Sequence, residues 1–482
     1  MHRYTRKGAL ATLVLLLACL GSAPHEGARR GAGHVRPGIT VLLADSAALI
    51  DGKRVGLLTN QTGVNEHGVS DIDLLVQRAK AKGGAGPQLT ALFSPEHGIR
   101  GTEDRTNLAN GLDARTGIPI YSLYGATTLA PPDSVLKTIE VLVIDLQDIG
   151  ARHWTFVATM VYAMRSASQL HLRVLVLDRP NPITGVHVEG PMLDTAFAYA
   201  GSNSAARAAT PTALYPIPMR HGLTLGELAR FYNEVLGLRA DLHVIPVDGW
   251  RRVDWFDQTK LPWIKPSPNM PNLTSATLYP GVVWLEATNI SVGRGTPEAF
   301  QRVGAPWLDA KKAIDLLESR NLPGVKFEAQ NFTPVHPGDD KYGGKTVHGI
   351  HIIITDRERL NTARVGAALL WAIIQTNGDS VRFQQKGFNQ LFGVRGAREA
   401  FMSGADPDSM IDASLPATIA FEQATKVRRP RSRARSEWLV SAWTSRYVAE
   451  RLKPVRREIS DKLSGSSLRA TSRRTWIARS AV

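Results

Sequence analysis

The stretch LFSPEHGIRG, residues 92–101, decides how the fold of this chain is interpreted. The apolar run at residues 89–93 is typical of a buried strand, and a Ser-Pro pair ends it in a loop that contains two glycines. Glu96, His97 and Arg100 follow the strand within that loop. In an open α/β sheet, ligands bind beyond the carboxyl ends of the strands, so this loop is a candidate functional site. The alternative is a capped turn whose charged groups only hydrogen-bond the backbone.

Three other apolar runs, at residues 55–59, 141–146 and 173–177, also end in polar loops. Helical patterns lie between the runs, over residues 70–82 and 155–169. Strands that alternate with helices and are almost continuously apolar predict an α/β fold with a mainly parallel sheet covered on both faces. The carboxyl ends of such strands meet at one edge, where we expect Asn60, Glu96, Asp145, Gln147, Asp148 and Arg152.

The second half of the chain also mixes strands and helices. Residues 347–355 predict a strand and residues 362–376 a helix, and a capping-box pattern at Thr224 and Glu227 begins another helix. A polar loop rich in proline and tryptophan spans residues 255–276, and loops this long in a compact chain are usually functional. We therefore expect a second α/β domain.

The net charge of +15 comes from the two ends of the chain. Residues 1–23 carry three Lys or Arg and no acid, and residues 426–482 carry 16 Lys or Arg against 4 Asp or Glu. The rest of the chain is therefore neutral overall, which argues against a nucleic-acid partner. The basic tail could contact an anionic membrane or wall surface, and the alternative is a solvated, poorly ordered tail.

Residues 1–23 have the pattern of a secretory signal: a basic start, an apolar run at residues 9–20 and small residues up to Ala23. We therefore expect an exported protein, periplasmic or extracellular. The single cysteine, Cys19, lies inside this segment, which excludes structural disulfides in the mature chain. Residues 16–19 loosely resemble a bacterial lipobox, so lipid anchoring at Cys19 stays open beside simple cleavage near Ala23.

Several common sites are absent from the sequence. There is no GxGxxG that opens a helix and no GxxxxGK[ST], so no nucleotide cofactor is expected. There is no HExxH, and His348 and His351 lie in a predicted strand that points them to opposite faces, so no metal site is expected. A GxSxG nucleophile elbow is also missing, which argues against a Ser/His/Asp hydrolase.

Eight polar blocks stand out between about residues 37 and 425. They are TNQTG (59–63), SPEHGIRG (94–101), DLQDIGAR (145–152), DRPNPITG (178–185), VEGP (188–191), PMRHGLTLGEL (218–228), PSPNMPNL (266–273) and TNISVGRGTPEAF (288–300). In this order they resemble the DUF1343 family, the bacterial exo-β-N-acetylmuramidases called NamZ. The chain departs from the family at its end: Leu415 stands where a tryptophan is expected, and an arginine-rich tail without counterpart follows Phe421.

The resemblance implies a Rossmann-like N-terminal domain, a second α/β domain and an active site in the cleft between them. It also implies hydrolysis that releases terminal β-N-acetylmuramic acid from peptidoglycan-derived glycans in cell-wall turnover, with Glu96 as the catalytic carboxylate. The expected divisions are a signal peptide at 1–23, a linker at 24–36, the Rossmann-like domain at 37–205, the C-terminal α/β domain at 206–425 and the basic tail at 426–482.

Glycoside hydrolysis needs an acid that protonates the leaving oxygen and usually a second carboxylate. Glu96 is the general-acid candidate, because a carboxyl group in a partly apolar cleft keeps its proton available near neutral pH. The second group could be Asp145, Asp148 or Glu286, each of which could instead only hydrogen-bond its neighbours. A route through the acetamido group of the sugar also stays open. His97 is interpreted as a hydrogen-bonding or proton-relay residue.

N-acetylmuramic acid carries a lactyl carboxylate, for which an arginine fork is the natural partner. Four arginines in the polar blocks are candidates, although two of them could tie loops together by salt bridges. Trp255, Trp263 and Trp284 could stack on sugar faces, although we expect at least half of them in the core. The substrate-binding candidates are Asn60, Arg100, Arg152, Arg220, His221, Asn269, Asn289 and Arg294.

Two other functions stay open at this point. The first is a non-catalytic protein that binds cell-wall glycans in the same cleft and lacks turnover. The second is an acyl or amide hydrolase of wall peptides, which the missing nucleophile elbow disfavours.

Overall fold

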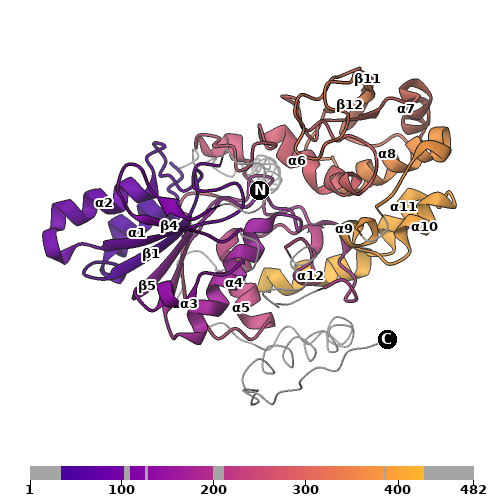
Figure 1. The fold of residues 1–482 in the computed structure, drawn as a ribbon. Coiled ribbons are helices and arrows are strands. Elements are labelled where there is room, and N and C mark those ends of the chain that lie inside the picture. Colours follow the sequence, from indigo (N-terminus) through magenta and orange to yellow (C-terminus); the bar gives the residue numbers. More distant parts are fainter. Residues whose placement is uncertain (1–33, 102–108, 125–128, 199–210, 385–386, 428–482) are drawn as a thin grey trace, which may run out of the picture.

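The computed structural model describes residues 34–101, 109–124, 129–198, 211–384 and 387–427 as two α/β domains (Figure 1). Four expectations concern residues outside this set: the signal peptide, the linker up to residue 33, the domain boundary at residues 205 and 206, and the tail after residue 427.

The core of the first domain is a seven-stranded sheet in the spatial order β3 (Gly111–Leu112), β4 (Pro119–Ser122), β2 (Gln88–Ser94), β1 (Arg54–Thr59), β5 (Val141–Asp145), β6 (Arg173–Leu177) and β9 (Asp241–Ile245). All neighbours pair in parallel except β3, which runs antiparallel to β4. Without β3, this is the order of the doubly wound dinucleotide-binding fold, and the order reverses between β1 and β5. The predicted mainly parallel, Rossmann-like sheet is confirmed.

Helices cover both faces of this sheet, which explains why its inner strands are apolar throughout. Leu57 belongs to the apolar cluster that contains α1 and α2, whereas Leu58 belongs to the one that contains α4 and α5, because successive residues of a strand point to opposite faces. These helices are α1 (Gly38–Asp45), α2 (Asp71–Lys82), α4 (Thr155–Gln169) and α5 (Leu225–Val235), and the short α3 (Asp133–Leu136) precedes β5.

The helices begin at the residues that the sequence indicates. The side chain of Ser70 accepts a hydrogen bond from the backbone N–H of Ile72 at the start of α2. Thr224 and Glu227 form the predicted capping box that begins α5. Each cap satisfies backbone donors that have no partner within the helix.

Strand β9 lies beyond residue 206 and still completes the first sheet, where it pairs with β6 from Arg173–Asp241 to Leu177–Ile245. The residues of this sheet therefore extend past residue 205, the expected end of the first domain. The sequence DLHVI of β9 hides this role, because the strand is at the sheet edge and alternates between exposed and partly buried residues.

The second domain contains a three-stranded antiparallel sheet in the order β10 (Arg302–Ala305), β12 (His348–Ile354) and β11 (Val325–Ala329). The strand and the helix predicted here are confirmed as β12 and α8. Its helices are α6 (Leu273–Val282), α7 (Ala310–Ser319), α8 (Thr362–Asn377), α9 (Phe388–Phe392), α10 (Ala397–Met402), α11 (Pro407–Asp412) and α12 (Leu415–Val427).

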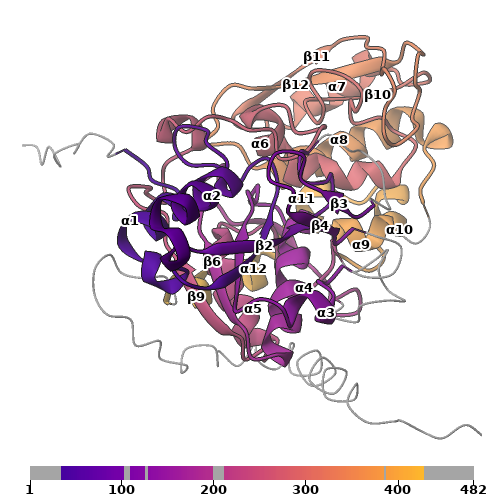
Figure 2. The same cartoon turned by 60° about the vertical axis from the view of Figure 1, so that its left-hand side comes forward.

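The last helix returns to the first domain (Figures 1 and 2). The Thr418 hydroxyl of α12 donates a 3.1 Å hydrogen bond to the carbonyl oxygen of Gly190, within the hairpin of β7 (Glu189–Met192) and β8 (Pro218–Arg220). The Phe421 ring packs edge-on against Phe231 of α5, with centroids 5.8 Å apart. Leu415, at the position where the family resemblance leads us to expect a tryptophan, is the first residue of this helix and is exposed.

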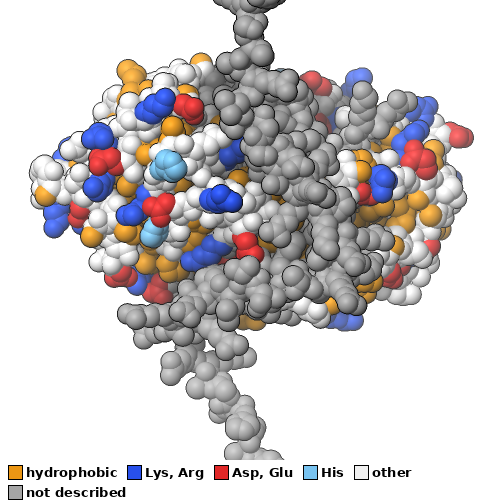
Figure 3. Space-filling model, turned by 90° about the horizontal axis from the view of Figure 1, so that it is seen from below, with side chains coloured by type: hydrophobic (Ala, Val, Ile, Leu, Met, Phe, Trp, Pro, Cys, Tyr) orange, Lys and Arg blue, Asp and Glu red, His pale blue; other side chains and the backbone are white. Residues whose placement is uncertain are grey.

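The surface of the described residues mixes both signs of charge, and Figure 3 shows Lys and Arg side chains interspersed with Asp and Glu on one face. This agrees with a neutral body whose excess positive charge belongs to the chain ends. Among the described residues, none of the helices combines the length and the apolar character needed to span a bilayer.

Candidate active site

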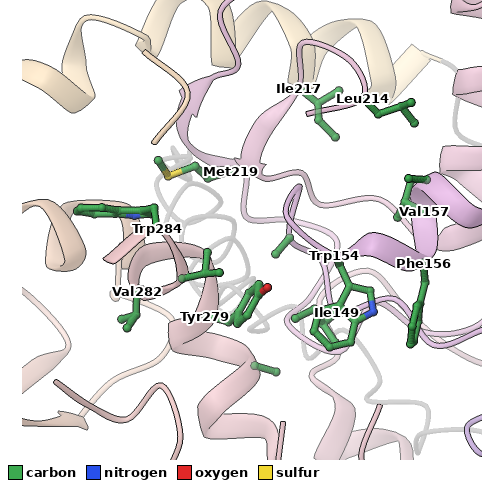
Figure 4. Close-up of a cluster of buried hydrophobic side chains, with 14 of the residues drawn as sticks. Ile149, Trp154, Phe156, Val157, Leu214, Ile217, Met219, Tyr279, Val282 and Trp284 are labelled. Carbon is green, nitrogen blue, oxygen red and sulfur yellow. The ribbon is translucent and has the colours of Figure 1, made fainter. Parts of the chain in front are cut away.

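A cavity of about 220 Å³ lies between the two domains. The first domain contributes the loop after β2 and the start of α4, and the second contributes α6, the short 3-10 helix at Val283–Ala287 and Leu391 of α9. Figure 4 shows Tyr279 of α6 beside Trp154, the residue that precedes α4, and their rings are 5.7 Å apart. The polar side chains of the wall are those of Glu96, His97, Tyr124, His153, Thr155, Thr212, Ser267, Asn269, Tyr279, Glu286 and Arg294.

Glu96 follows β2 by two residues and is half-buried in the wall of this cavity. The Thr155 hydroxyl donates a short hydrogen bond to its Oε2 atom, and Thr155 is the first residue of α4. This contact fixes the carboxyl group at the amino end of the helix. The other oxygen, Oε1, makes no hydrogen bond within the described part of the chain. The structure therefore places Glu96 in the wall of a cavity between the two domains.

His97 adopts a left-handed backbone conformation, with φ of 70°, and Gly98 follows with φ of 77°. This conformation is uncommon for a residue with a side chain, and such residues cluster at functional sites. It turns the loop after β2 sharply, and both Glu96 and His97 then line the cavity.

Glu286 and Arg294 bring an ion pair into the same cavity from the second domain. The Nε atom of Arg294 donates a short hydrogen bond to Oε1 of Glu286, and both side chains are about one-fifth exposed. The Arg294 guanidinium also lies 5.6 Å from the centroid of the Phe300 ring. The cavity thus contains two carboxyl groups, one from each domain, and a guanidinium beside the second.

Tyr279 lies between these charges. Its pKa is raised well above the usual value, chiefly by burial and further by the negative charges of Glu286 and Glu96, while Arg294 opposes the shift. The phenol therefore keeps its proton at every physiological pH and can act as a hydrogen-bond donor in the cavity.

Beside Glu96, the wall contains a buried histidine that the sequence analysis did not single out. The Nε2 atom of His153 lies 2.7 Å from the carbonyl oxygen of Leu391, and its Nδ1 atom is buried without a hydrogen-bond partner among the described residues. Burial and the positive charge of Arg152 hold the His153 pKa well below its usual value. A buried acceptor left unpaired costs about 1–3 kcal/mol.

Arg152 itself lies behind the wall of the cavity. Its guanidinium donates to the carbonyl oxygens of Leu391 at 2.8 Å and Thr212 at 3.3 Å and forms no ion pair in the described part of the protein. Burial lowers the pKa of Arg152 to about 9. It therefore contributes positive charge close to the cavity without lining it.

Two of the predicted catalytic carboxylates are buried elsewhere. Asp145, at the end of β5, is fully buried and accepts two hydrogen bonds from Arg179, one of them 2.9 Å long. Asp148 accepts a 2.7 Å hydrogen bond from the backbone N–H of Gly150, and its Oδ2 atom lies 3.4 Å from Nε2 of His221. Neither residue is brought to the cavity.

The Asp145–Arg179 pair occupies the sheet edge where the strand order reverses, the position at which folds of this order usually bind a ligand. Asn60 lies at the same edge, and its Oδ1 atom accepts hydrogen bonds from the N–H and the hydroxyl of Thr62. The Gln147 amide donates to the carbonyl oxygens of Asp148 and Pro180. The polar residues expected at this edge are therefore largely bonded to neighbouring protein groups, and the cavity lies to one side, at the end of β2.

The predicted substrate-binding residues separate into two groups. Arg294 and Asn269 line the cavity. Arg152 lies behind the cavity wall and donates to two residues of it, whereas the others contact protein groups away from the cavity. The exposed Arg100 pairs with Asp113 at 2.6 Å, and the fully buried Arg220 pairs with Glu189 at 2.6 Å. Asn60 is bonded to Thr62 at the sheet edge. The last two candidates are Asn289, bonded to Ser380 and Arg382, and His221, bonded to Leu223.

The tryptophans considered for sugar stacking do not line the cavity. Trp255 and Trp284 are fully buried, as expected for at least half of the three, and the partly buried Trp263 packs on Phe256. The cavity is lined instead by Trp154, Tyr124 and Tyr279.

The sequence analysis missed His153, Thr155 and Tyr279. His153 and Thr155 directly follow the block DLQDIGAR, but they stand among aromatic residues in WTF and are easily taken for a helix start. Tyr279 belongs to a helix that is buried from Ser275 to Val282, so it is easily taken for a core residue. The one feature of the sequence that could have indicated His153 and Thr155 is that HWT, residues 153–155, directly follows the polar block at residues 145–152.

Known proteins share both the sequence and the fold. Residues 55–274 match the family described as exo-beta-N-acetylmuramidase NamZ, N-terminal, and residues 277–428 match its C-terminal counterpart. The peptidoglycan beta-N-acetylmuramidase NamZ of Bacillus subtilis (strain 168) is 38% identical over 397 residues, which cover 82% of this chain and 90% of that protein.

Crystal structures of two DUF1343 family proteins from Bacteroides fragilis NCTC 9343 are also similar. One is 32% identical with a TM-score of 0.70, and the match covers 81% of this chain and 98% of that one. The other is 29% identical with a TM-score of 0.63, and the match covers 82% and 98%.

The two family regions run from β1 to the end of α12 and meet just after the start of α6, whose Tyr279 lines the cavity. The cavity with Glu96 is therefore built from both halves of the family's architecture. The chain belongs to the NamZ family of exo-β-N-acetylmuramidases.

Proposed function

We propose that this protein is an exo-acting glycoside hydrolase that releases terminal β-N-acetylmuramic acid from peptidoglycan fragments. The observation that carries the proposal is the single cavity in which Glu96 of the first domain and the Glu286–Arg294 pair of the second line the same space. Its volume of about 220 Å³ lies below the roughly 300–1,000 Å³ of pockets for larger ligands, which favours one terminal sugar over a long glycan segment.

In this proposal Glu96 protonates the glycosidic oxygen as the bond to the anomeric carbon breaks, and water supplies the new hydroxyl group. Glu286 is the other carboxylate on the cavity wall, and it provides the negative charge that an oxocarbenium-like transition state requires. Arg294, which lies beside it, is the guanidinium available to the lactyl carboxylate of the sugar.

The test compares Glu96→Gln with the wild type on two substrates that differ in their leaving group. On a β-1,4-linked N-acetylmuramic acid disaccharide, kcat should fall by about 100- to 10,000-fold, because the departing sugar oxygen needs a proton. On a nitrophenyl β-N-acetylmuramide the loss should be smaller, because nitrophenolate leaves without one. The exposed, remote Glu140 supplies the control Glu140→Gln, which should match the wild type.

Equal losses on the two substrates would show that Glu96 is not the proton donor. A wild-type protein that binds the disaccharide without turnover would instead support the wall-binding function.

We also propose that the protein acts outside the cytoplasm, which the basic and apolar pattern of residues 1–23 and the class of substrate support. Amino-terminal sequencing of the mature protein distinguishes cleavage near Ala23 from processing at Cys19. Fatty-acid labelling that disappears in Cys19→Ser would establish an anchor. Membrane or wall binding lost on truncation after Val427 would assign that contact to the basic tail.

A further inference from the structure

The hydrogen bond between His153 and Leu391 determines which nitrogen of the ring carries the proton. A carbonyl oxygen only accepts, so Nε2, at 2.7 Å from it, must be the donor. In a neutral imidazole the other nitrogen then carries a lone pair. Nδ1 of His153 is therefore a hydrogen-bond acceptor with a fixed orientation.

The surroundings of the ring keep it in this neutral form. His153 is about 1% exposed, and its sequence neighbour Arg152 is a fully buried cation that donates to the same Leu391 carbonyl. Protonation of Nδ1 would place a second positive charge beside a guanidinium in a buried site, which is costly.

One carboxylate oxygen of each glutamate in the cavity accepts a hydrogen bond from a protein donor. Thr155 donates to Oε2 of Glu96, and Arg294 donates to Oε1 of Glu286. Nδ1 of His153 is buried in the same wall and makes no hydrogen bond to any described residue. Buried acceptors are rarely left unpaired, so a donor from a bound ligand is the natural partner.

We propose that Nδ1 of His153 accepts a hydrogen bond from a donor group of the terminal amino sugar, either its acetamido N–H or a ring hydroxyl. The inference rests on the proposed function and adds a substrate-recognition residue to it. A site that hydrogen-bonds a substrate N–H or O–H discriminates strongly against analogues that lack it, because the acceptor would again be left unpaired.

Two matched substitutions separate this role from a structural one. In His153→Gln the side-chain amide nitrogen can replace Nε2 and still donate to Leu391, but no acceptor remains at the position of Nδ1. In His153→Asn the side-chain oxygen takes the position of Nδ1, and the contact with Leu391 is lost. Circular dichroism and thermal unfolding check that both variants fold.

For the nitrophenyl β-N-acetylmuramide, we expect kcat/KM of His153→Gln to be about 10- to 100-fold lower than that of the wild type. His153→Asn should recover part of the loss. Three analogues, which lack the acetamido group, the 4-hydroxyl or the 6-hydroxyl, identify the group that donates to Nδ1. On the analogue that lacks this group, the wild type and His153→Gln should be equally active.

A fully active Gln variant beside an impaired Asn variant would overturn the proposal and leave His153 a structural role. So would an equal loss by His153→Gln on every analogue. Calorimetry of free N-acetylmuramic acid binding keeps the test separate from turnover. A sugar that binds the wild type and not His153→Gln supports the inference even if no hydrolysis is found, whereas no binding by the wild type contradicts both proposals.

Discussion

At the scale of single residues, the buried carboxyl group of Asp71 makes a pH-dependent contribution to stability. Asp71 is fully buried at the start of α2, and its pKa is raised well above the usual value, first by burial and then by the charge of Asp145. The folded protein therefore holds this proton to a higher pH than the unfolded chain does. Asp71 stabilises the fold at acidic pH, and this contribution is lost as pH rises through the folded-state pKa.

Asp71→Asn imitates the protonated acid and removes this dependence. The free energy of unfolding of the variant relative to the wild type should rise by up to about 1.4 kcal/mol per pH unit between roughly pH 4 and the folded-state pKa. Urea unfolding at several pH values measures it. Asp73→Asn on the same helix is the control. A difference that stays constant with pH would mean that Asp71 is ionised in the fold.

At the scale of elements, the loop between β11 and β12 holds the segment that carries Glu286 and Arg294. The Lys341 ammonium donates to the carbonyl oxygens of Glu286 at 2.8 Å and Ile290 at 3.1 Å. The Tyr342 hydroxyl donates a 2.6 Å hydrogen bond to the carbonyl oxygen of Asn289. The loop thus positions Glu286 through the backbone rather than through its side chain.

Lys341→Met should lower kcat about tenfold, because the position of Glu286 becomes less fixed. A tenfold fall corresponds to a loss of about 1.4 kcal/mol in transition-state stabilisation. KM should change less. Lys345→Met, an exposed lysine of the same loop, should behave like the wild type. A fall in melting temperature with unchanged kcat would assign Lys341 a structural role alone.

At the scale of the whole molecule, the buried Glu189–Arg220 ion pair of the first domain is hydrogen-bonded to the second domain. Glu189 of β7 accepts a 2.6 Å hydrogen bond from Arg220 of β8 and hydrogen bonds from the N–H and hydroxyl of Thr362, the first residue of α8. Removing one partner of a buried pair leaves the other uncompensated.

Glu189→Gln should therefore lower the free energy of unfolding by about 3–5 kcal/mol. Denaturant unfolding followed by tryptophan fluorescence measures this loss. The control is Asp241→Asn, which removes the exposed pair with Arg173 at the sheet edge and should change stability by less than about 1 kcal/mol. Similar losses in both variants would contradict a special role for the buried Glu189–Arg220 pair.

Features of this fold that depend on neighbouring residues in the sequence could be predicted, whereas features that depend on distant partners could not. The runs at β1, β2, β5 and β6 and the caps of α2 and α5 were readable because strand periodicity and helix capping are local properties. β9 was missed because an edge strand need not be apolar.

The α/β class, the parallel sheet and the loop after β2 with Glu96 could be predicted from the residue pattern alone, because burial on both faces and strand-ending turns show in the local pattern. Which polar residues share the cavity depends on how the chain folds. Asp145 and Arg220 have buried partners 34 and 31 residues away, whereas Tyr279 and Glu286 reach the cavity of Glu96 through the packing of the two domains. A side chain's partner depends on distances in the folded chain, which residue type and spacing do not encode.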